Sequence, residues 1–197
     1  MAKNKLYELI ISRRSIRFFK QKDVSQNIIK KAINCGRLAP SAANLQFLEY
    51  LIVKRKEIKK KVFNCLRFAA YVAPKRNPPR NKQPDFYIVL LINKERSQAP
   101  NLRDIGASAQ NIMLSLLSFG VGSCWLQNID KDSLSKILDI GQSYEIDSII
   151  AAGFPKERPN LETDSVNVKY WLDNKNCLHV PKRPLEDVWH YNVLKRR

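Results

Sequence analysis

The sequence predicts an α+β protein, with helices and strands mixed in an order that lacks regular βαβ alternation. Three observations predict this class. The segment at 85–93 is apolar and rich in β-branched and aromatic residues, which is typical of a central strand. Segments with helical periodicity precede and follow it, at 25–36 and 103–120. The glycine fingerprints GxGxxG and GxxxxGK[ST] do not occur, so a doubly wound nucleotide-binding fold is not indicated.

In the first half of the chain, local signals mark the helix ends. Ser25 precedes an apolar stripe and predicts an N-cap, and Gly36 predicts the end of that helix. A short helix before it should end at the arginines that follow Ser12. The expected elements are helices at 6–12, 25–36 and 57–68, a turn at 37–46, strands at 47–54 and 85–93, and a proline-rich loop at 74–84.

In the second half, the longest helix is predicted from Asp104 to Gly120. Its small residues at 106–109 would let another helix approach closely, from the same subunit or from a partner. Further expected elements are a strand or extended turn at 121–127, a helix capped by Asp130, and a strand at 148–155. Residues 155–180 lack periodicity, and so long an unstructured segment suggests a function or wrapping around a partner.

Length and composition favour one domain spanning residues 1–197. The longest apolar run, Tyr87 to Ile92, is far shorter than a bilayer span, and the N-terminus lacks the pattern of a signal peptide. We therefore expect a cytoplasmic protein with no membrane association.

The formal net charge of +17 lies entirely in the first half, because residues 1–98 hold 23 Lys/Arg and 6 Asp/Glu, whereas residues 99–197 hold 12 of each. Basic runs at 54–61 and 74–82 would suit nucleic acid, an anionic surface or an acidic protein. A solvated helix face followed by a basic loop is the alternative. The runs lack interleaved aromatic residues, which makes nucleic-acid binding the weaker hypothesis.

Cysteine and histidine usage indicates neither a disulfide framework nor a metal site. The four cysteines are scattered without a CxxC pair, and we expect no pairing with a nearby histidine. Only His179 and His190 are available, so a Ser/His/Asp triad is not indicated either.

The segment ISRRSIRFF gathers three arginines around one serine. If this segment is extended, Arg13, Ser15 and Arg17 point to the same side, because alternate residues of an extended chain share a face. Two guanidinium groups and a hydroxyl would suit phosphate oxygens or an electron-rich ring carbonyl. An exposed turn with solvated arginines is the alternative.

Four further stretches occur in a characteristic order: APSAANLQ (39–46), GVGSCWLQN (120–128), IIAAGFPKERP (149–159) and HVPKRPLEDVWHYN (179–192). Together with the arginine segment, they resemble the nitroreductase family of FMN-dependent oxidoreductases over nearly the whole chain. The resemblance implies a three-layer fold with a central, mainly antiparallel sheet flanked by helices. It also implies an intertwined homodimer with FMN sites at the interface, and a C-terminal tail at 155–197 that wraps the partner.

The resemblance assigns cofactor contacts residue by residue. The arginine segment would hold the flavin phosphate, ribityl chain and N1/O2 edge, the loop at 40–46 would cover the flavin from the other subunit, and the turn after the long helix would offer a backbone N–H to N5. A basic pair near the C-terminus would complete the phosphate site. The implied residues are Arg13, Arg14, Ser15, Arg17, Pro40, Ser41, Ala42, Asn44, Gln46, Trp125, Leu126, Gln127, Lys182 and Arg183.

The implied activity is ping-pong transfer of electrons from NADH or NADPH, through FMN, to a small nitroaromatic, quinone or similar acceptor. The flavin carries the chemistry, so no catalytic side chain and no metal are expected. A flavin-dependent dehalogenase or dehydrogenase of the same fold is one alternative, and a basic nucleic-acid-binding protein is another. The basic first half further suggests an acidic electron donor such as ferredoxin or flavodoxin.

Overall fold

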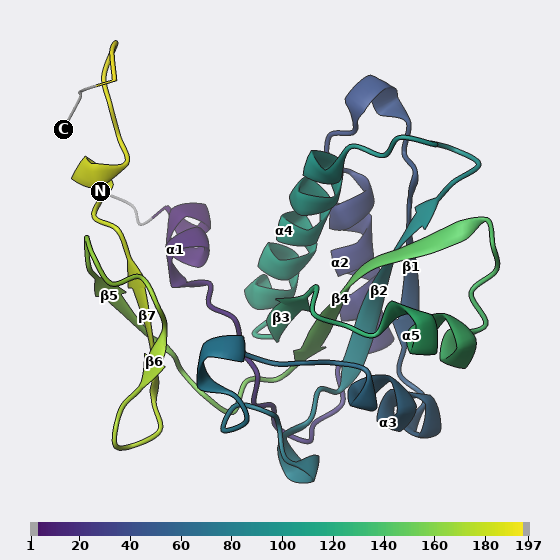
Figure 1. The fold of residues 1–197 in the computed structure, drawn as a ribbon, viewed down its shortest axis with the longest axis horizontal. Coiled ribbons are helices and arrows are strands. Elements are labelled where there is room, and N and C mark those ends of the chain that lie inside the picture. The colour runs from purple at the N-terminus through teal and green to yellow at the C-terminus, as the bar shows by residue number, and fades with distance from the viewer. Residues whose placement is uncertain (1–3, 195–197) are drawn as a thin grey trace.

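The computed structural model describes residues 4–194; residues 1–3 and 195–197, and with them the end of the expected tail, lie outside the described residues. The α+β class is confirmed, with an antiparallel sheet between helices (Figure 1). The helices are α1 (Lys5–Ser12), α2 (Gln26–Arg37), α3 (Lys56–Asn64), α4 (Leu102–Ser118) and α5 (Lys131–Leu138). The strands are β1 (Leu48–Val53), β2 (Phe86–Asn93), β3 (Gly122–Leu126), β4 (Tyr144–Gly153), β5 (Asn160–Thr163), β6 (Trp171–Leu172) and β7 (Leu178–Lys182).

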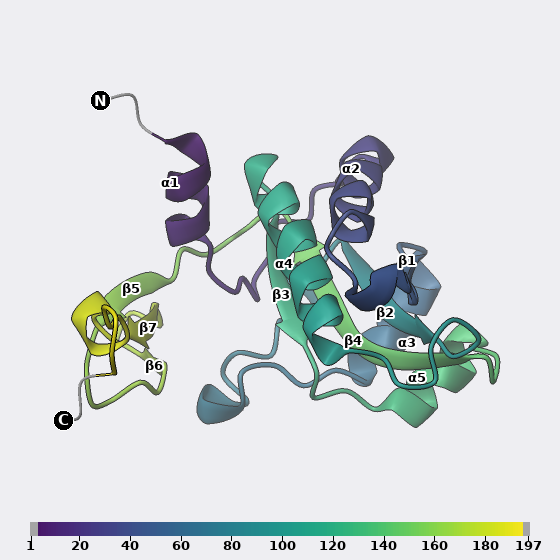
Figure 2. The same cartoon turned by 90° about the horizontal axis from the view of Figure 1, so that it is seen from above.

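The main sheet has the strand order β1-β2-β4-β3, and its neighbouring strands are antiparallel. Strand β2 is buried along its whole length, as its apolar sequence predicts. Its side chains alternate between two apolar layers, so Ile88 and Leu90 pack with α2 and α4, whereas Val89 and Leu91 pack with α3 and α5. Figure 2 shows the two helix pairs on opposite faces of the sheet, which confirms the three-layer arrangement.

Several predicted helix ends are confirmed by their hydrogen bonds. The Ser25 hydroxyl accepts the Ile28 N–H at 3.4 Å at the start of α2, and Asp130 accepts the Ser133 N–H at 3.0 Å at the start of α5. Gly120 follows α4 with a φ of +73°, the left-handed conformation that commonly ends a helix. These positions were readable from local sequence because their chemistry is local.

Gly36 has a different role from the one expected. Helix α2 continues to Arg37, and Gly36 lies buried inside it against α4. A Cβ at this position would lie 2.6 Å from Cγ1 of Ile112. The missing side chain therefore allows α2 and α4 to pack closely, and does not end the helix.

Other bounds differ because of contacts distant in sequence. The basic helix expected at 57–68 ends at Asn64, because Leu66 leaves it to form an antiparallel bridge with Ile129. The strand expected at 148–155 begins at Tyr144, since β2 extends to Asn93 and pairs with it there. Helix α4 begins at Leu102 with Asn101 as its N-cap, ahead of the expected Asp104.

The expectation that residues 155–180 are unstructured is wrong. Strands β5, β6 and β7 form a second, three-stranded sheet in the order β5-β7-β6, in which β5 runs parallel to β7. We call residues 156–194 the arm. Both views place the arm beside α1 and to one side of the three layers (Figures 1 and 2). Within residues 4–194, none of the helices combines the length and apolar composition that crossing a bilayer requires.

Candidate functional site

The arginine segment runs along the outer edge of the main sheet. It leaves α1 at Ser12 in an extended conformation, and Ser15 forms a parallel bridge with Ser123 of β3. The Ile16 N–H donates to the Ser123 carbonyl at 2.9 Å. The segment thus extends the sheet by a short parallel pairing, and its side chains are held on defined faces.

Two arginines of this segment lie near the core thiol of β3. The charges of Arg17 and Arg13 both act on the buried Cys124 thiol and oppose the rise of its pKa. Arg14 borders a cleft between the main body and the arm, and its guanidinium donates to the Ile11 carbonyl at 2.8 Å. The Arg14 guanidinium therefore binds the C-terminal end of α1.

Burial sets the electrostatics of this region. The pKa of Arg13 is lowered by burial and then by the charge of Arg14, yet the group stays protonated at neutral pH. Burial also raises the pKa of the Cys124 thiol, against the opposing effect of Arg17 and Arg13. Cys124 is consequently a neutral thiol in the core and not a nucleophile.

An ion pair that the sequence did not reveal anchors the segment. Glu157, at the start of the arm, accepts the backbone N–H groups of Arg17 at 2.5 Å and Phe18 at 3.0 Å. Its other carboxylate oxygen pairs with Arg76 of the basic loop, which is only 2% exposed and lies over the Phe18 ring. Burial, and then the charge of Arg17, lower the pKa of Arg76 to about 10. The Arg76–Glu157 pair joins the loop, the arginine segment and the arm.

The same region holds buried donors that this chain leaves unpaired. Among the described residues, Nε of Arg14, Nε of Arg17 and Nε of Arg76 are buried without a hydrogen-bond partner. Buried guanidinium N–H groups normally find an acceptor, because leaving one unpaired costs about 1–3 kcal/mol. Each of these N–H groups could donate to an added acceptor, such as an oxygen of a phosphate or of a flavin ring carbonyl.

Strand β3 also contributes backbone to this edge. The side chains of Trp125 and Leu126 turn into opposite core layers, and the Trp125 indole donates to the Ser148 hydroxyl at 2.7 Å. Because alternate strand residues direct their backbone groups to the same edge, the N–H of Trp125 shares the edge on which Ser123 is bonded. Gln127 follows the strand and is exposed. The expected contribution of this stretch is therefore a backbone N–H.

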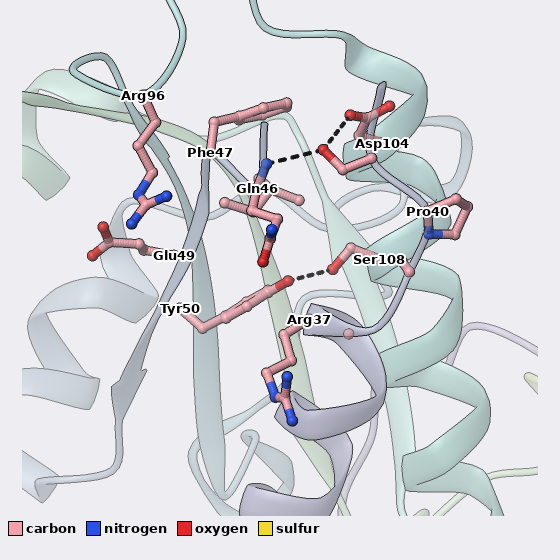
Figure 3. Close-up of a pocket in the computed structure, with 13 residues that line it drawn as sticks. Arg37, Pro40, Gln46, Phe47, Glu49, Tyr50, Arg96, Asp104 and Ser108 are labelled. Atoms are coloured by element: carbon pink, nitrogen blue, oxygen red, sulfur yellow. Dashed lines mark hydrogen bonds between the residues drawn. The ribbon is translucent and has the colours of Figure 1, made fainter. Parts of the chain in front are cut away.

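The loop at 40–46 lies at a different part of the molecule, next to a cavity of about 230 Å³ (Figure 3). Asp104 at the start of α4 accepts the Ser41 hydroxyl at 2.9 Å and the Ala42 N–H at 2.8 Å. The Ser41 hydroxyl in turn accepts the Gln46 N–H at 3.1 Å. Asp104, expected only to start a helix, instead fixes this loop.

The loop is held in an unusual backbone conformation. Asn44 and Gln46 both have positive φ values, of 54° and 49°. Non-glycine residues adopt this region only where surrounding contacts enforce it. Figure 3 shows Tyr50 and Ser108 at the base of the adjoining cavity, where their hydroxyls are 2.7 Å apart. The loop is thus a preformed surface feature, in which Pro40 borders the cavity.

The C-terminal basic pair lies on the arm. Lys182 ends β7 and pairs in register with Thr163, and the Arg183 guanidinium donates to the Asp187 carbonyl at 2.8 Å. The cavity beside the loop at 40–46 shares no lining residue with the cleft that Arg14 and the arm border. A single chain therefore brings Arg13, Ser15 and Arg17 to the edge of β3, but it does not gather all the expected residues at one place.

The fold is an α+β arrangement in which an extended, arginine-rich segment lies on the edge of an antiparallel sheet. A model described as the nitroreductase family matches residues 10–154, and the chain belongs to that family. A relative from Archaeoglobus fulgidus, provisionally named an NADH dehydrogenase/NAD(P)H nitroreductase, is 27% identical over 161 residues, which cover 78% of this chain and 87% of the relative.

Solved structures share the fold. A provisionally named nitroreductase from Desulfovibrio desulfuricans, solved in complex with FMN, has a TM-score of 0.74 and 20% identity, with 98% of this chain and 100% of that chain covered. An FMN-dependent nitroreductase from Clostridium difficile has a TM-score of 0.68 and 23% identity, with 94% and 98% covered. The resemblance expected from the sequence is confirmed at the level of family and fold.

Proposed function

We propose that the protein is an FMN-dependent oxidoreductase that takes electrons from NADH or NADPH and passes them to nitroaromatic, quinone or similar acceptors. The observation that carries this proposal is the buried, unpaired Nε of Arg17, which lies in the extended cationic segment that pairs with the edge of β3. Family membership and the FMN named for two relatives of the same fold support it. When bound, FMN would supply the hydride and electron chemistry.

The chain's own residues would bind and orient the cofactor. Arg13 and Arg17 would place positive charge at its phosphate and its electron-rich ring edge, while Ser15 would donate a hydroxyl. The backbone N–H of Trp125 or its neighbours Leu126 and Gln127 would face the ring nitrogen that receives hydride. Cys124, as a neutral buried thiol, takes no part.

We propose that the complete site forms only in a homodimer. The loop at 40–46, with Pro40, Ser41, Ala42, Asn44 and Gln46, is held by its own hydrogen bonds and borders a cavity separate from the cleft of the arginine segment. A second copy would supply this loop, and the arm would wrap that copy and bring Lys182 and Arg183 to the phosphate. Exposed apolar residues support this role of the arm, namely Leu185, Val188, Trp189, Tyr191, Val193 and Leu194.

Replacement of Arg13 and Arg17 by alanine tests the assignment. The double variant should bind FMN about 10²- to 10⁴-fold more weakly, because it loses two charge-assisted hydrogen bonds of about 1.5–3 kcal/mol each. The matched control replaces the exposed Lys30 and Lys60 by alanine and removes the same charge. Flavin-to-protein ratios after purification, with far-UV circular dichroism, measure both. Full flavin content in the Arg13/Arg17 variant contradicts the assignment.

Turnover assays test the activity. NADH and NADPH oxidation, each with a nitroaromatic and a quinone acceptor, should give parallel lines in double-reciprocal plots, as ping-pong transfer requires. A protein that carries FMN but reduces only a halogenated or peptide-bound substrate would instead favour the dehalogenase or dehydrogenase alternative. A colourless protein with steeply salt-dependent retention on DNA would favour nucleic-acid binding.

The basic runs give less support to nucleic acid than their sequence suggests. Lys54 pairs with Asp23 at 2.8 Å, Lys59 donates to the Asp85 carbonyl at 2.6 Å, and Arg76 is buried against Glu157. An acidic electron-transfer protein as donor remains a further proposal, tested by the ionic-strength dependence of its reduction rate. We also propose a cytoplasmic location, which the four free cysteines support.

A further inference from the structure

The turn between β6 and β7 gathers a cluster of side chains that the proposed flavin site does not use. Asp173, Cys177 and His179 each contribute one ligand-type atom, and these atoms all lie within 4.8 Å of one another. The expectation that no cysteine pairs with a nearby histidine is therefore wrong. The sequence signal was the spacing Asp-x₃-Cys-x-His at 173–179.

The two oxygens of the Asp173 carboxylate have different contacts. Its Oδ1 accepts the backbone N–H groups of Lys175 at 2.9 Å and Cys177 at 2.7 Å, which fixes the turn. Its Oδ2 is left to face Nε2 of His179 at 3.2 Å. The carboxylate thus has one oxygen held by the turn and one oxygen directed into the cluster.

The His179 ring is oriented from two sides. Its Nδ1 contacts the Glu162 carboxylate, across from β7 on the parallel strand β5. The indole of Trp171 stacks on the ring with a centroid separation of 4.2 Å and an interplanar angle of 14°. A carboxylate on one ring nitrogen, leaving the other nitrogen to point into a donor cluster, is the arrangement that surrounds metal-bound histidines.

We propose that Asp173, Cys177 and His179 bind a zinc ion, with water in the fourth position. Imidazole, thiolate and carboxylate are the ligands that Zn²⁺ uses. Zinc bonds of about 2.0–2.3 Å in a tetrahedron separate nitrogen and oxygen ligands by about 3.3 Å, close to the observed Asp173–His179 distance of 3.2 Å.

The remaining ligand and the open position also fit the site. The Cys177 thiol now contacts the Arg158 carbonyl at 3.7 Å, and on binding it would release its proton to solvent and turn toward the metal. All three ligand residues are half-buried, so water reaches the fourth position. The ion would link the turn to β5 through Glu162 and stabilise the arm.

Cobalt titration tests the site without relying on flavin. The full-length protein, purified, reduced and freed of metal by chelator, should bind one Co²⁺ per chain with tetrahedral d–d bands at longer wavelength than flavin absorbs. Equimolar Zn²⁺ should displace the cobalt. Substoichiometric or featureless Co²⁺ binding by the unmodified protein would overturn the proposal, whether or not FMN is bound.

Variants separate a metal site from a plain cluster of ion pairs. Cys177→Ser should lose the thiolate-to-cobalt charge-transfer band, whereas Cys35→Ser, a half-buried cysteine outside the cluster, should keep it. Glu162→Gln retains every ligand and should weaken Zn²⁺ binding about 10- to 100-fold. Unchanged Zn²⁺ affinity in both Cys177→Ser and Glu162→Gln would show that the cluster holds only ion pairs.

Discussion

The main body and the arm are built on different principles. The body encloses its sheet between two continuous apolar layers, in which residues such as Phe86, Ile112 and Leu116 are inaccessible to solvent. The arm forms short strands and exposes much of its apolar surface, including Trp189 at 62% and Leu194 at 74%. The body therefore has a continuous apolar core of its own, whereas the arm leaves many of its large apolar side chains exposed, as partner-binding surfaces do.

The junction between them coincides with the proposed cofactor site. Glu157 opens the arm, binds the backbone of the arginine segment and pairs with the buried Arg76. Tyr170 of the arm also lies against the Arg17 guanidinium, 5.5 Å from the ring centroid. The arm's position and the orientation of the cationic residues are thus set by the same contacts, so disturbing one should disturb the other.

The largest expected effect comes from one substitution made in each region. Leu116→Ala in the body should cost about 3–4 kcal/mol of unfolding free energy, because Leu116 is 0% exposed and its removal leaves a cavity. Leu185→Ala in the arm, where the leucine is 65% exposed, should change the unfolding of the isolated subunit by under about 0.5 kcal/mol. Urea denaturation at low protein concentration measures both. Equal losses would remove the distinction between body and arm.

The elements of the body could be predicted from the sequence, whereas those of the arm could not. Capping by Ser25 and Asp130 and the buried strand β2 follow from neighbouring residues, and all are found as expected. The arm was missed because its strands are short and largely exposed, and because β5 and β7 pair in parallel across a long connection. A periodic pattern of apolar residues appears in a sequence only where one face of an element is buried. The arm buries little apolar surface within its own chain, so its strands leave no such pattern.

The site shows the same limit. The extended segment pairs with β3 at Ser15, as its alternation allows, and the shared face of Arg13, Ser15 and Arg17 stays a prediction. Its anchor was not predictable, because Glu157 reaches Arg17 over 140 residues of sequence. No local pattern distinguishes Glu157 from a surface carboxylate in a basic stretch. Arg76 likewise has no local signal that separates it from the other basic residues of the proline-rich loop.

A somewhat smaller effect is expected at the junction. Glu157→Gln keeps an oxygen for the backbone N–H groups of Arg17 and Phe18 but leaves Arg76 buried without its counter-charge, at a cost of about 2–3 kcal/mol. Flavin content should fall in parallel. Adding Arg76→Met should recover part of the stability, because an apolar side chain needs no partner there. Additive losses in the double variant, by urea denaturation, would show that the pair is not coupled.

The interface role of the arm can be tested by Trp189→Ala. Buried tryptophans dominate interfaces, so truncation should weaken a homodimer by about 2 kcal/mol, or roughly 30-fold in Kd. Val166→Ala is the control, since Val166 is also an exposed apolar residue of the arm but lies outside the C-terminal apolar group. Sedimentation velocity over a range of concentrations measures both. Identical dissociation of Trp189→Ala and the unmodified protein would remove Trp189 from the interface.

The smallest effect is expected from acid titration of matched carboxylates. Backbone N–H donors lower the pKa of Asp130 in the body, chiefly from Ser133, and of Asp164 in the arm, chiefly from Asn167. Each folded pKa lies below the unfolded value of about 3.9, so the contribution of each carboxylate to the free energy of unfolding is present above that pH and is lost as pH falls through the folded pKa.

Asp130→Asn should therefore reduce the loss of global unfolding free energy as the pH is lowered. We expect Asp164→Asn to alter only local amide exchange at residues 166 and 167, because the N–H groups of these two residues are the ones that donate to Asp164. A global change from Asp164→Asn, of the size given by Asp130→Asn, would mean that body and arm unfold as one unit.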